Sequence, residues 1–266
     1  MEVIVSAAVS SDGYLDDCTP RRLVLSCAED WAEVHRLRAW CDAILVGAET
    51  VRRDNPSLVI RDAGLRIWRE WLGMKHDLTK VTVTAGGSLD AGARFFTEGP
   101  GAEKIVVTVP AVRRGLEERL PSGVRVVALE EITAGGILDA LEGFGVRSLM
   151  VEGGARTIGM FLDAGVVDSL RLAVSPAAVR YACPAFSGIR PSAVRRSCGE
   201  GRAEGGRYGG VRIRFPSGLG RVDADRPAPV AACGGVGRTQ RTVRYGLSGR
   251  VRGGRARRPG VRGLYS

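Results

Sequence analysis

The stretch that most constrains the fold is residues 147–165, RSLMVEGGARTIGMFLDAG. Residues 148–151 form a short apolar run that predicts a buried strand, and the Glu-Gly-Gly of residues 152–154 predicts a tight turn. In residues 155–164 the apolar side chains recur at the spacing of a helix with one buried face. This order leaves free backbone N–H groups at the helix start, which favour an anion such as a pyrophosphate. The alternative is an ordinary strand-to-helix turn that uses glycine for its shape alone.

Strand-like and helical patterns alternate over the first two thirds of the chain, which predicts an α/β domain. Strands are expected at residues 2–9, 23–25, 42–47, 57–60, 80–84, 104–109, 124–129, 148–151 and 169–174. Helices are expected at residues 26–41, 48–53, 65–75, 113–120, 136–144 and 155–164. The continuous apolar run 42–47 is typical of a mostly parallel central sheet with helices on both faces.

Ligands in such folds bind at the carboxyl ends of the parallel strands. Five residues fall at or just past predicted strand ends, namely Gly13, Gly47, Arg61, Thr84 and Glu152. Their shared placement predicts a ligand cleft at this edge of the sheet.

The predicted helix over residues 26–41 carries two further signals. Ser26 and Glu29 stand three residues apart, as the N-cap and N3 residues of a capping box do. Arg38 flanks the apolar face, where an arginine either extends toward solvent or binds an anion, and the sequence leaves both roles open. In the helix over residues 65–75, Trp68 and Trp71 fall on one side, which favours core or dimer contacts over a ligand cage.

Positive charge is concentrated at the end of the chain. The 266 residues carry a net charge of +10, but residues 190–266 alone contain 18 arginines and four carboxylates, so residues 1–189 are mildly acidic. Residues 190–266 also hold 17 glycines and too few large apolar side chains for a second core. We therefore predict a domain over residues 1–189, followed by an Arg/Gly-rich divergent tail that is disordered or encoded partly out of frame. Nucleic-acid binding is the weaker alternative, because the tail has few aromatic residues for base stacking.

The six cysteines form no CxxC pair, and His35 and His76 are the two histidines of the chain, so the sequence predicts no metal site. Unpaired cysteines are typical of a reducing compartment. The first residues, MEVIVSAAVSSDG, lack the basic and long apolar regions of a signal peptide. No apolar run reaches the roughly 20 residues of a membrane span. These features predict a cytoplasmic protein with no membrane association.

Three stretches together resemble one known family. They are SAAVSSDGYLDD (6–17), VHRLRAWCDAILVGAETVRRDNPSLVIRD (34–62) and LMVEGGARTIGMFLDAGVVDSLRLAVSP (149–176). They resemble the reductase domain of riboflavin biosynthesis, which has a dihydrofolate-reductase-like fold. The resemblance covers residues 1–176, with the motifs in the order expected for that family.

The resemblance implies that NADPH reduces the ribosyl group of 5-amino-6-(5-phosphoribosylamino)uracil to a ribityl chain. Arg38 and Arg61 would hold the sugar phosphate, since a guanidinium fork matches a phosphate and stays charged. Leu58 and Glu152 would assist them. Arg22 stands where many members of the family have serine, and it is a further candidate for a phosphate contact.

The resemblance also implies a set of residues for the NADPH site. Ala8, Thr50 and Asp54 would line it, and Ala85 is a weaker candidate. The start of the last helix would bind the cofactor's phosphates through its amides, with Gly153, Gly154, Ala155, Arg156, Thr157, Ile158 and Gly159 as the candidates.

The implied reaction needs little acid–base machinery, because a ring-opened imine at the ribose C1′ would accept the hydride. Glu152, Asp54 and water are the candidates for the proton donor. Asp54 has a structural alternative as a turn former before Asn55-Pro56, and Thr50 has one as a helix-capping or core hydroxyl. The family further implies a homodimer whose ligand is a phosphoribosylated aminopyrimidine.

Two other functions fit the sequence less closely. One is the same fold acting on another pterin-like or nucleoside-like substrate in a secondary pathway. The other is a non-catalytic nucleotide-binding protein whose basic tail binds nucleic acid.

Overall fold

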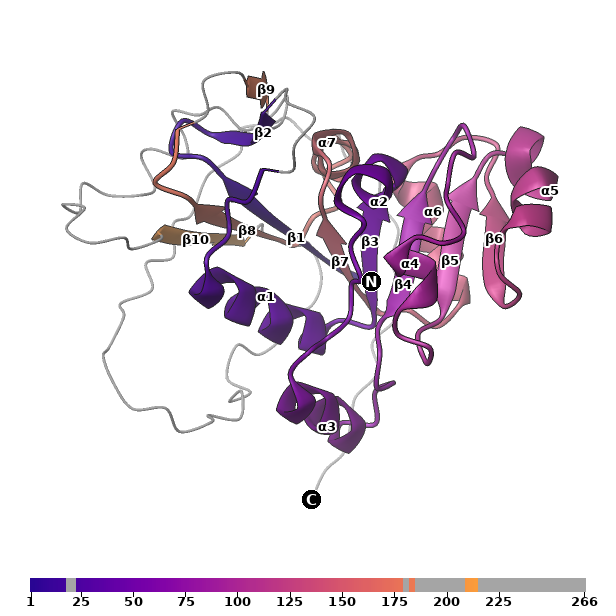
Figure 1. Cartoon of the computed structure of the whole chain (residues 1–266), viewed down its shortest axis with the longest axis horizontal. Helices are drawn as coiled ribbons and strands as arrows, with labels where there is room; N and C mark the ends of the chain where they lie inside the picture. Colours follow the sequence, from indigo (N-terminus) through magenta and orange to yellow (C-terminus); the bar gives the residue numbers. More distant parts are fainter. Residues whose placement is uncertain (18–22, 179–181, 185–208, 215–266) are drawn as a thin grey trace, which may run out of the picture.

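The computed structural model describes residues 1–17, 23–178, 182–184 and 209–214. Within these residues the chain forms a central sheet of eight strands in the order β10-β8-β1-β7-β3-β4-β5-β6 (Figure 1). Its strands are β1 (Glu2–Val9), β3 (Ala43–Gly47), β4 (Thr79–Val83), β5 (Lys104–Thr108), β6 (Val124–Ala128), β7 (Ser148–Glu152), β8 (Ser169–Val174) and β10 (Gly209–Arg214). A separate two-stranded sheet pairs β2 (Tyr14–Asp17) with β9 (Ala182–Pro184). The helices are α1 (Ala28–Trp40), α2 (Ala48–Asp54), α3 (Ala63–Trp71), α4 (Arg94–Thr97), α5 (Pro110–Arg119), α6 (Ala134–Gly143) and α7 (Ala155–Asp163).

The strands from β8 to β6 all run parallel to their neighbours, and β10 pairs antiparallel with β8. Parallel neighbours bring the carboxyl ends of β1, β3, β4 and β7 to one edge of the sheet. The prediction of an α/β fold with a mostly parallel sheet is therefore confirmed.

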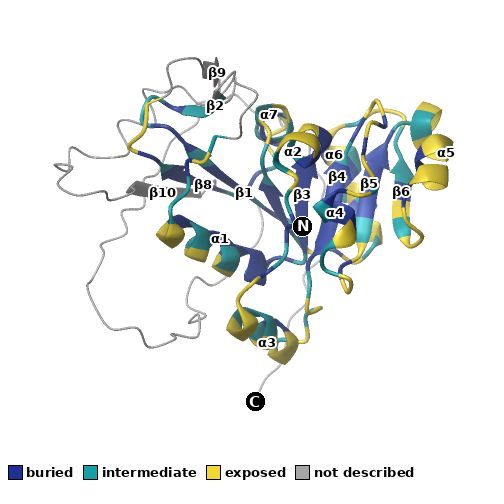
Figure 2. Ribbon diagram, viewed as in Figure 1, coloured by how far each residue is buried: buried dark blue, intermediate teal, exposed yellow. Residues whose placement is uncertain are grey.

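Each face of the sheet packs against its own set of helices. Val5, Leu45 and Phe161 are fully buried in the core under α6 and α7. Ile44 and Phe95 are fully buried in the second core, under α1, α2, α4 and α5. Adjacent residues of one strand, such as Ile44 and Leu45, point to opposite cores, and this explains why the strands are apolar at every position. Figure 2 shows the central strands β3, β4, β5 and β7 as mostly buried and the outer sides of α1, α3 and α5 as exposed.

Two predicted strands are wrong. Residues 23–25 precede α1 as an irregular segment, and residues 57–60 pass from α2 to α3 without pairing to a described strand. In the second segment, Leu58 has a φ of 51°, which breaks the extended backbone that a strand needs. Apolar residues in both segments, such as Leu25 and Ile60, are nevertheless buried. The apolar sequence pattern therefore indicated buried side chains and not hydrogen-bonded strands.

The predicted capping box is also wrong. Helix α1 begins at Ala28, and its N-cap is Cys27, whose side chain makes no capping hydrogen bond. Ser26 lies one residue too early to serve. The first turn instead carries Glu29 and Asp30, whose negative charge suits the helix dipole.

The predicted boundary at residue 190 needs a correction. Strand β10 comes from residues 209–214, within the predicted tail, and it covers the edge of β8 (Figure 1). The alternation in VRIR at residues 211–214 is typical of an antiparallel strand, but the composition of the surrounding tail concealed it. The remainder of residues 190–266 lies outside the described residues.

The two tryptophans of α3 differ. Trp68 packs against the second core and meets the Trp40 ring edge-on, with ring centroids 4.7 Å apart, as a core residue does. Trp71 is 80% exposed, so the expected core contact fails there. No helix in the described part of the chain is long and apolar enough to cross a membrane.

Candidate active site

A pocket of about 1140 Å³ opens at the carboxyl edge of the sheet. It is lined by residues of β1, by the ends of β3, β4 and β7, and by the starts of α1, α2 and α7. Its volume lies just above the roughly 300–1,000 Å³ of common small-molecule sites. The pocket lies where the sequence places the ligand cleft.

Two strand-to-helix turns meet in the middle of this pocket. Gly47 joins β3 to α2, and Gly153 and Gly154 join the neighbouring β7 to α7. Gly153 and Gly154 have φ angles of 69° and 79°, which favour glycine. A Cβ on Gly153 would lie 2.9 Å from Thr50 Cγ2, and one on Gly47 would lie 2.5 Å from Thr157 Oγ1. Glycine is therefore required at both turns for the starts of α2 and α7 to pack this closely.

The start of α7 has amides without a helical partner. Its N-cap, Gly154, provides no side-chain hydrogen bond, and the first intrahelical bond runs from Ile158 N to Gly154 O. The N–H groups of the preceding turn are left without an intrahelical acceptor. These donors and the dipole of α7 together favour an anionic ligand in this part of the pocket.

Arg38 and Glu152 are joined directly. Arg38 Nε donates to Glu152 Oε1 at 2.9 Å, and Arg38 Nη2 donates to Oε2 at 2.7 Å. Their side chains are 7% and 15% exposed, and Glu152 lines the pocket. The end of α1 that carries Arg38 is fixed by the buried Arg69, whose Nη1 donates to the carbonyl oxygens of Ala39 and Cys41 at 2.9 and 2.6 Å. Of the two roles left open for Arg38, binding an anionic group is the one observed, with Glu152 as the anion.

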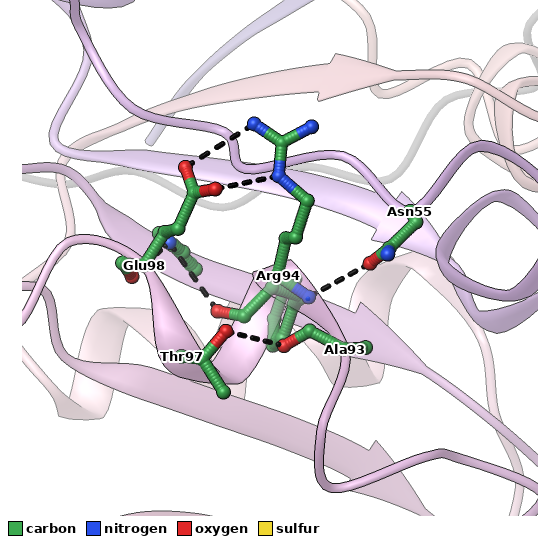
Figure 3. Close-up of polar contacts among 7 residues, drawn as sticks. Asn55, Ala93, Arg94, Thr97 and Glu98 are labelled. Atoms are coloured by element: carbon green, nitrogen blue, oxygen red, sulfur yellow. Dashed lines mark hydrogen bonds and ion pairs between the residues drawn. The ribbon is translucent and has the colours of Figure 1, made fainter.

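A strained loop follows α2. Asn55 and Leu58 have φ angles of 41° and 51°, which are uncommon for residues other than glycine. Asn55 Oδ1 accepts a hydrogen bond from the backbone N of Arg94, next to the Arg94–Glu98 ion pair of α4 (Figure 3). Farther along, Val59 Cγ1 lies only 3.0 Å from where a Cβ of Gly99 would stand. Contacts on both sides of Leu58 hold this backbone in place, as strained functional loops require.

His35 lies among the charged groups that flank Glu152. Burial, followed by the charge of Arg38, lowers the pKa of His35, while Glu152 raises it and the charge of Arg61 lowers it further. His35 Nδ1 is buried without a hydrogen-bond partner in the described part of the chain. Arg61 is exposed, and its effect on His35 places it in the same neighbourhood as Arg38.

Residues 1–194 match the model of one protein family, the RibD C-terminal domain. The chain belongs to this family. It is similar to two proteins named 2,5-diamino-6-ribosylamino-4(3H)-pyrimidinone 5′-phosphate reductase. The one from Archaeoglobus fulgidus is 33% identical over 65% of this chain and 80% of its own length. The one from Aquifex aeolicus is 34% identical over 66% of this chain and 77% of its own.

Solved structures of RibD-type domains agree with the fold. A diaminohydroxyphosphoribosylaminopyrimidine deaminase/5-amino-6-(5-phosphoribosylamino)uracil reductase from Thermotoga maritima is 27% identical, with a TM-score of 0.56 over 71% of this chain. This chain spans about half of that protein, 48% of its length. A pyrimidine reductase-like protein from Corynebacterium diphtheriae is 25% identical, with a TM-score of 0.58 over 67% of this chain and 76% of its own. The expected dihydrofolate-reductase-like fold is therefore confirmed, and the chain is a reductase of the RibD type.

The pocket unites most of the residues that the resemblance implied for the cofactor. The members that line it are Ala8, Thr50, Asp54, Ala85, Gly153, Gly154, Ala155, Arg156 and Thr157. Ile158 and Gly159 do not line it: the Ile158 side chain is buried in the first core, and its N–H donates to the carbonyl oxygen of Gly154. Their implied contact with the cofactor stays a prediction.

The residues implied for the substrate are divided. Glu152 lines the pocket, whereas Arg38, Leu58 and Arg61 lie outside its lining. Of these three, Arg38 is hydrogen-bonded to Glu152. Leu58 is buried as a whole residue, with 3% of its surface exposed, and its implied contact with the substrate stays a prediction. Arg22 lies outside the described residues.

The RibD-type pocket has a buried ionic cluster that the sequence analysis missed. Arg171 of β8 contacts Ser6 of β1 and both Asp30 and Glu33 of α1. Arg171 stands between Leu170 and Leu172, and a single arginine within an apolar strand was the signal that pointed to a buried ionic partner. In the described residues, no cluster of His, Cys, Asp and Glu could hold a metal ion.

Proposed function

We propose that this RibD-type reductase uses NADPH to reduce the ribosyl group of a 5′-phosphorylated ribosylaminopyrimidine to a ribityl chain, in riboflavin biosynthesis. The observation that carries the proposal is the glycine turn of Gly153 and Gly154, which brings the free amides of α7 next to Glu152 in a single pocket. The names of the relatives from Archaeoglobus fulgidus and Aquifex aeolicus support the substrate class.

The residues present fit a dinucleotide cofactor. The pyrophosphate would lie against the start of α7, where Gly154 has no Cβ to block its approach. On either side, the pocket continues over the end of β4 at Ala85 and over β1 at Ala8. When bound, NADPH supplies a hydride. The small side chains of Ala8 and Ala85 would leave room for the flat rings of the cofactor.

Glu152 serves to orient the substrate in this proposal. Both of its oxygens accept hydrogen bonds from Arg38, which holds the carboxylate at a fixed position on the pocket wall. A carboxylate held in this way suits sugar hydroxyl groups that donate to it. Asp54 also lines the pocket, and of these two carboxylates it is the candidate for proton transfer, with water as the alternative donor.

The sugar phosphate is proposed to bind beside Glu152, between the ends of α1 and of the strained loop. Arg38 and Arg61 would supply positive charge there, and the backbone N–H of Leu58 would supply a donor. His35 is close enough to Arg38 and Arg61 to sense the added negative charge. A cytoplasmic homodimer is the form in which we expect the enzyme to act, and sedimentation of the purified chain measures its oligomeric state.

NADPH binding to matched glycine variants tests the proposal. Gly154→Val should abolish saturable NADPH binding, followed by nicotinamide fluorescence, because its side chain would stand where the pyrophosphate approaches. Gly145→Val is the control, because Gly145 has the same φ of 79° but lies between α6 and β7, away from the pocket lining. Equal weakening of NADPH binding by the two variants would contradict the proposed site.

A further inference from the structure

The buried cluster around Arg171 forms one wall of the pocket. Ser6 and Arg171 are register partners on the adjacent strands β1 and β8. Arg171 Nη1 donates to Ser6 Oγ at 3.3 Å, and Arg171 Nη2 donates to Asp30 Oδ1 and to Glu33 Oε2, the latter at 3.2 Å. Ser6, Asp30 and Arg171 line the pocket, whereas Glu33 does not.

The cluster has unused hydrogen-bonding capacity. Asp30 Oδ2 and Arg171 Nε have no partner within the described residues, although the two side chains are only 2% and 4% exposed. Buried polar atoms in folded proteins are nearly always paired, so an unpaired acceptor and donor in a pocket wall point to a ligand. The unpaired oxygen of Asp30 can only accept a hydrogen bond while the carboxylate is ionised, and it therefore favours a ligand that donates one.

The surroundings of Asp30 indicate the shape of that ligand. Trp31 follows Asp30 in α1 and also lines the pocket, with part of its ring accessible. An aromatic surface next to a buried carboxylate suits a flat nitrogen heterocycle that carries adjacent N–H groups. The Arg171 guanidinium stays positively charged. Burial lowers its pKa, but the hydrogen bonds and charges of Asp30 and then Glu33 outweigh this effect and raise the pKa above its usual value.

Two pyrimidine rings are named among the relatives, and they differ at one position. The pyrimidinone of the Archaeoglobus fulgidus protein carries an amino group at C2, where the uracil of the Thermotoga maritima protein carries an oxygen. An amino group beside the ring N3–H presents two adjacent donors, which match a carboxylate. An oxygen at C2 presents an acceptor, which a carboxylate repels.

We propose that Asp30 is the residue that reads the C2 position, that Arg171 holds Asp30 in place, and that the enzyme therefore prefers the 2,5-diaminopyrimidinone over the 5-aminouracil. This inference rests on the proposed function, since it presumes that a ribosylaminopyrimidine binds in this pocket. A site built around a hydrogen bond discriminates strongly against an analogue that leaves its polar group unpaired. We expect kcat/KM to favour the diaminopyrimidinone at least about 100-fold.

The test is steady-state reduction of both 5′-phosphorylated compounds by the full chain and by Asp30→Asn. The asparagine amide keeps the shape of Asp30 but offers an N–H to an oxygen at C2, so the ratio of the two kcat/KM values should fall about 100-fold or invert. Glu33→Gln is the control, because Glu33 binds the same guanidinium but lies outside the pocket lining, and the ratio should stay at the wild-type value.

The possible outcomes separate this inference from the proposed function. Reduction of neither compound by the wild-type chain would overturn the proposed function. A wild-type preference for the uracil would overturn the inference alone, and this comparison does not depend on whether a variant folds. Equal loss on both compounds in Asp30→Asn would also overturn it, since a purely structural ion pair has no reason to alter the ratio.

Discussion

The two ends of α1 are attached to the sheet by ion pairs of opposite polarity. Near its start, Asp30 and Glu33 meet Arg171 of the sheet, and near its end Arg38 meets Glu152. Acidic groups at the start of the helix and a basic group at the end both complement the helix dipole. The same helix therefore holds two side chains that line the pocket, Arg171 near its start and Glu152 near its end.

The two pairs differ in how fully they use their hydrogen-bonding atoms. Arg38 and Glu152 form two parallel bonds, which occupy both carboxylate oxygens. The complete pair fixes the position of its carboxylate on the pocket wall. The incomplete pair, Asp30 and Arg171, leaves one acceptor and one donor without a partner in the described part of the chain. Two ion pairs that are similarly buried thus differ in the number of hydrogen-bonding atoms that they leave without a partner.

The largest loss of stability is expected when Glu152, the carboxylate of the complete pair, is removed. Glu152→Leu leaves the Arg38 guanidinium buried with no partner, and a guanidinium cannot lose its charge. We expect the free energy of unfolding in urea to fall by about 3–5 kcal/mol, with loss of activity. Glu118→Gln in the exposed pair with Arg114 is the control, with a change below about 0.5 kcal/mol. A similar change in both variants would mean that the buried pair is not a support.

A smaller, pH-dependent loss of stability is expected when the ion pair near the start of α1 is removed. Arg171→Leu leaves Asp30 buried, but an unpartnered carboxylate can take up a proton. We expect a loss of about 2–4 kcal/mol at pH 7 that shrinks as the pH falls toward 5, whereas the loss in Glu152→Leu does not shrink over this range. Urea unfolding at several pH values measures both. A loss in Arg171→Leu that does not change with pH would remove this distinction between the two ends.

The smallest effect on stability is expected from His35, which lies near the end of α1 that carries Arg38. Burial and Arg38 lower its pKa in the folded protein below the usual 6.5, so the unfolded chain binds the proton first as the pH falls. Stability due to the neutral imidazole is complete above pH 6.5 and is lost between 6.5 and the folded pKa. His35→Gln should flatten this part of the profile, by less than about 1.4 kcal/mol per pH unit. An unchanged profile would show that another group controls the slope.

The sequence was sufficient for the seven described parallel strands of the sheet, because most of them are apolar on both faces and are separated by clear helices. It also located the glycine turn at residues 153–154 and the residues around it in the pocket. It could not locate the pairing of Arg38 with Glu152 or of Arg171 with Asp30, since both join residues more than 100 positions apart. Burial and strand pairing also look alike in short apolar runs, which is why residues 57–60 were assigned wrongly.

The composition of residues 190–266 hid strand β10 for a related reason. A strand at the edge of a sheet needs only a few alternating residues, and six of them were embedded in an Arg/Gly-rich segment. Composition averages over a long window and cannot detect so short an element.

Transfer of hydrogen from the cofactor to the ribosyl carbon tests the central claim most directly. The full chain would be incubated with NADPH labelled with deuterium at the transferable position and with the 5′-phosphorylated diaminopyrimidinone, and the product would be followed by mass spectrometry and NMR. The account predicts a ribityl product that carries deuterium at C1′, formed in step with oxidation of NADPH. Tight binding of both compounds without label in the product would contradict it.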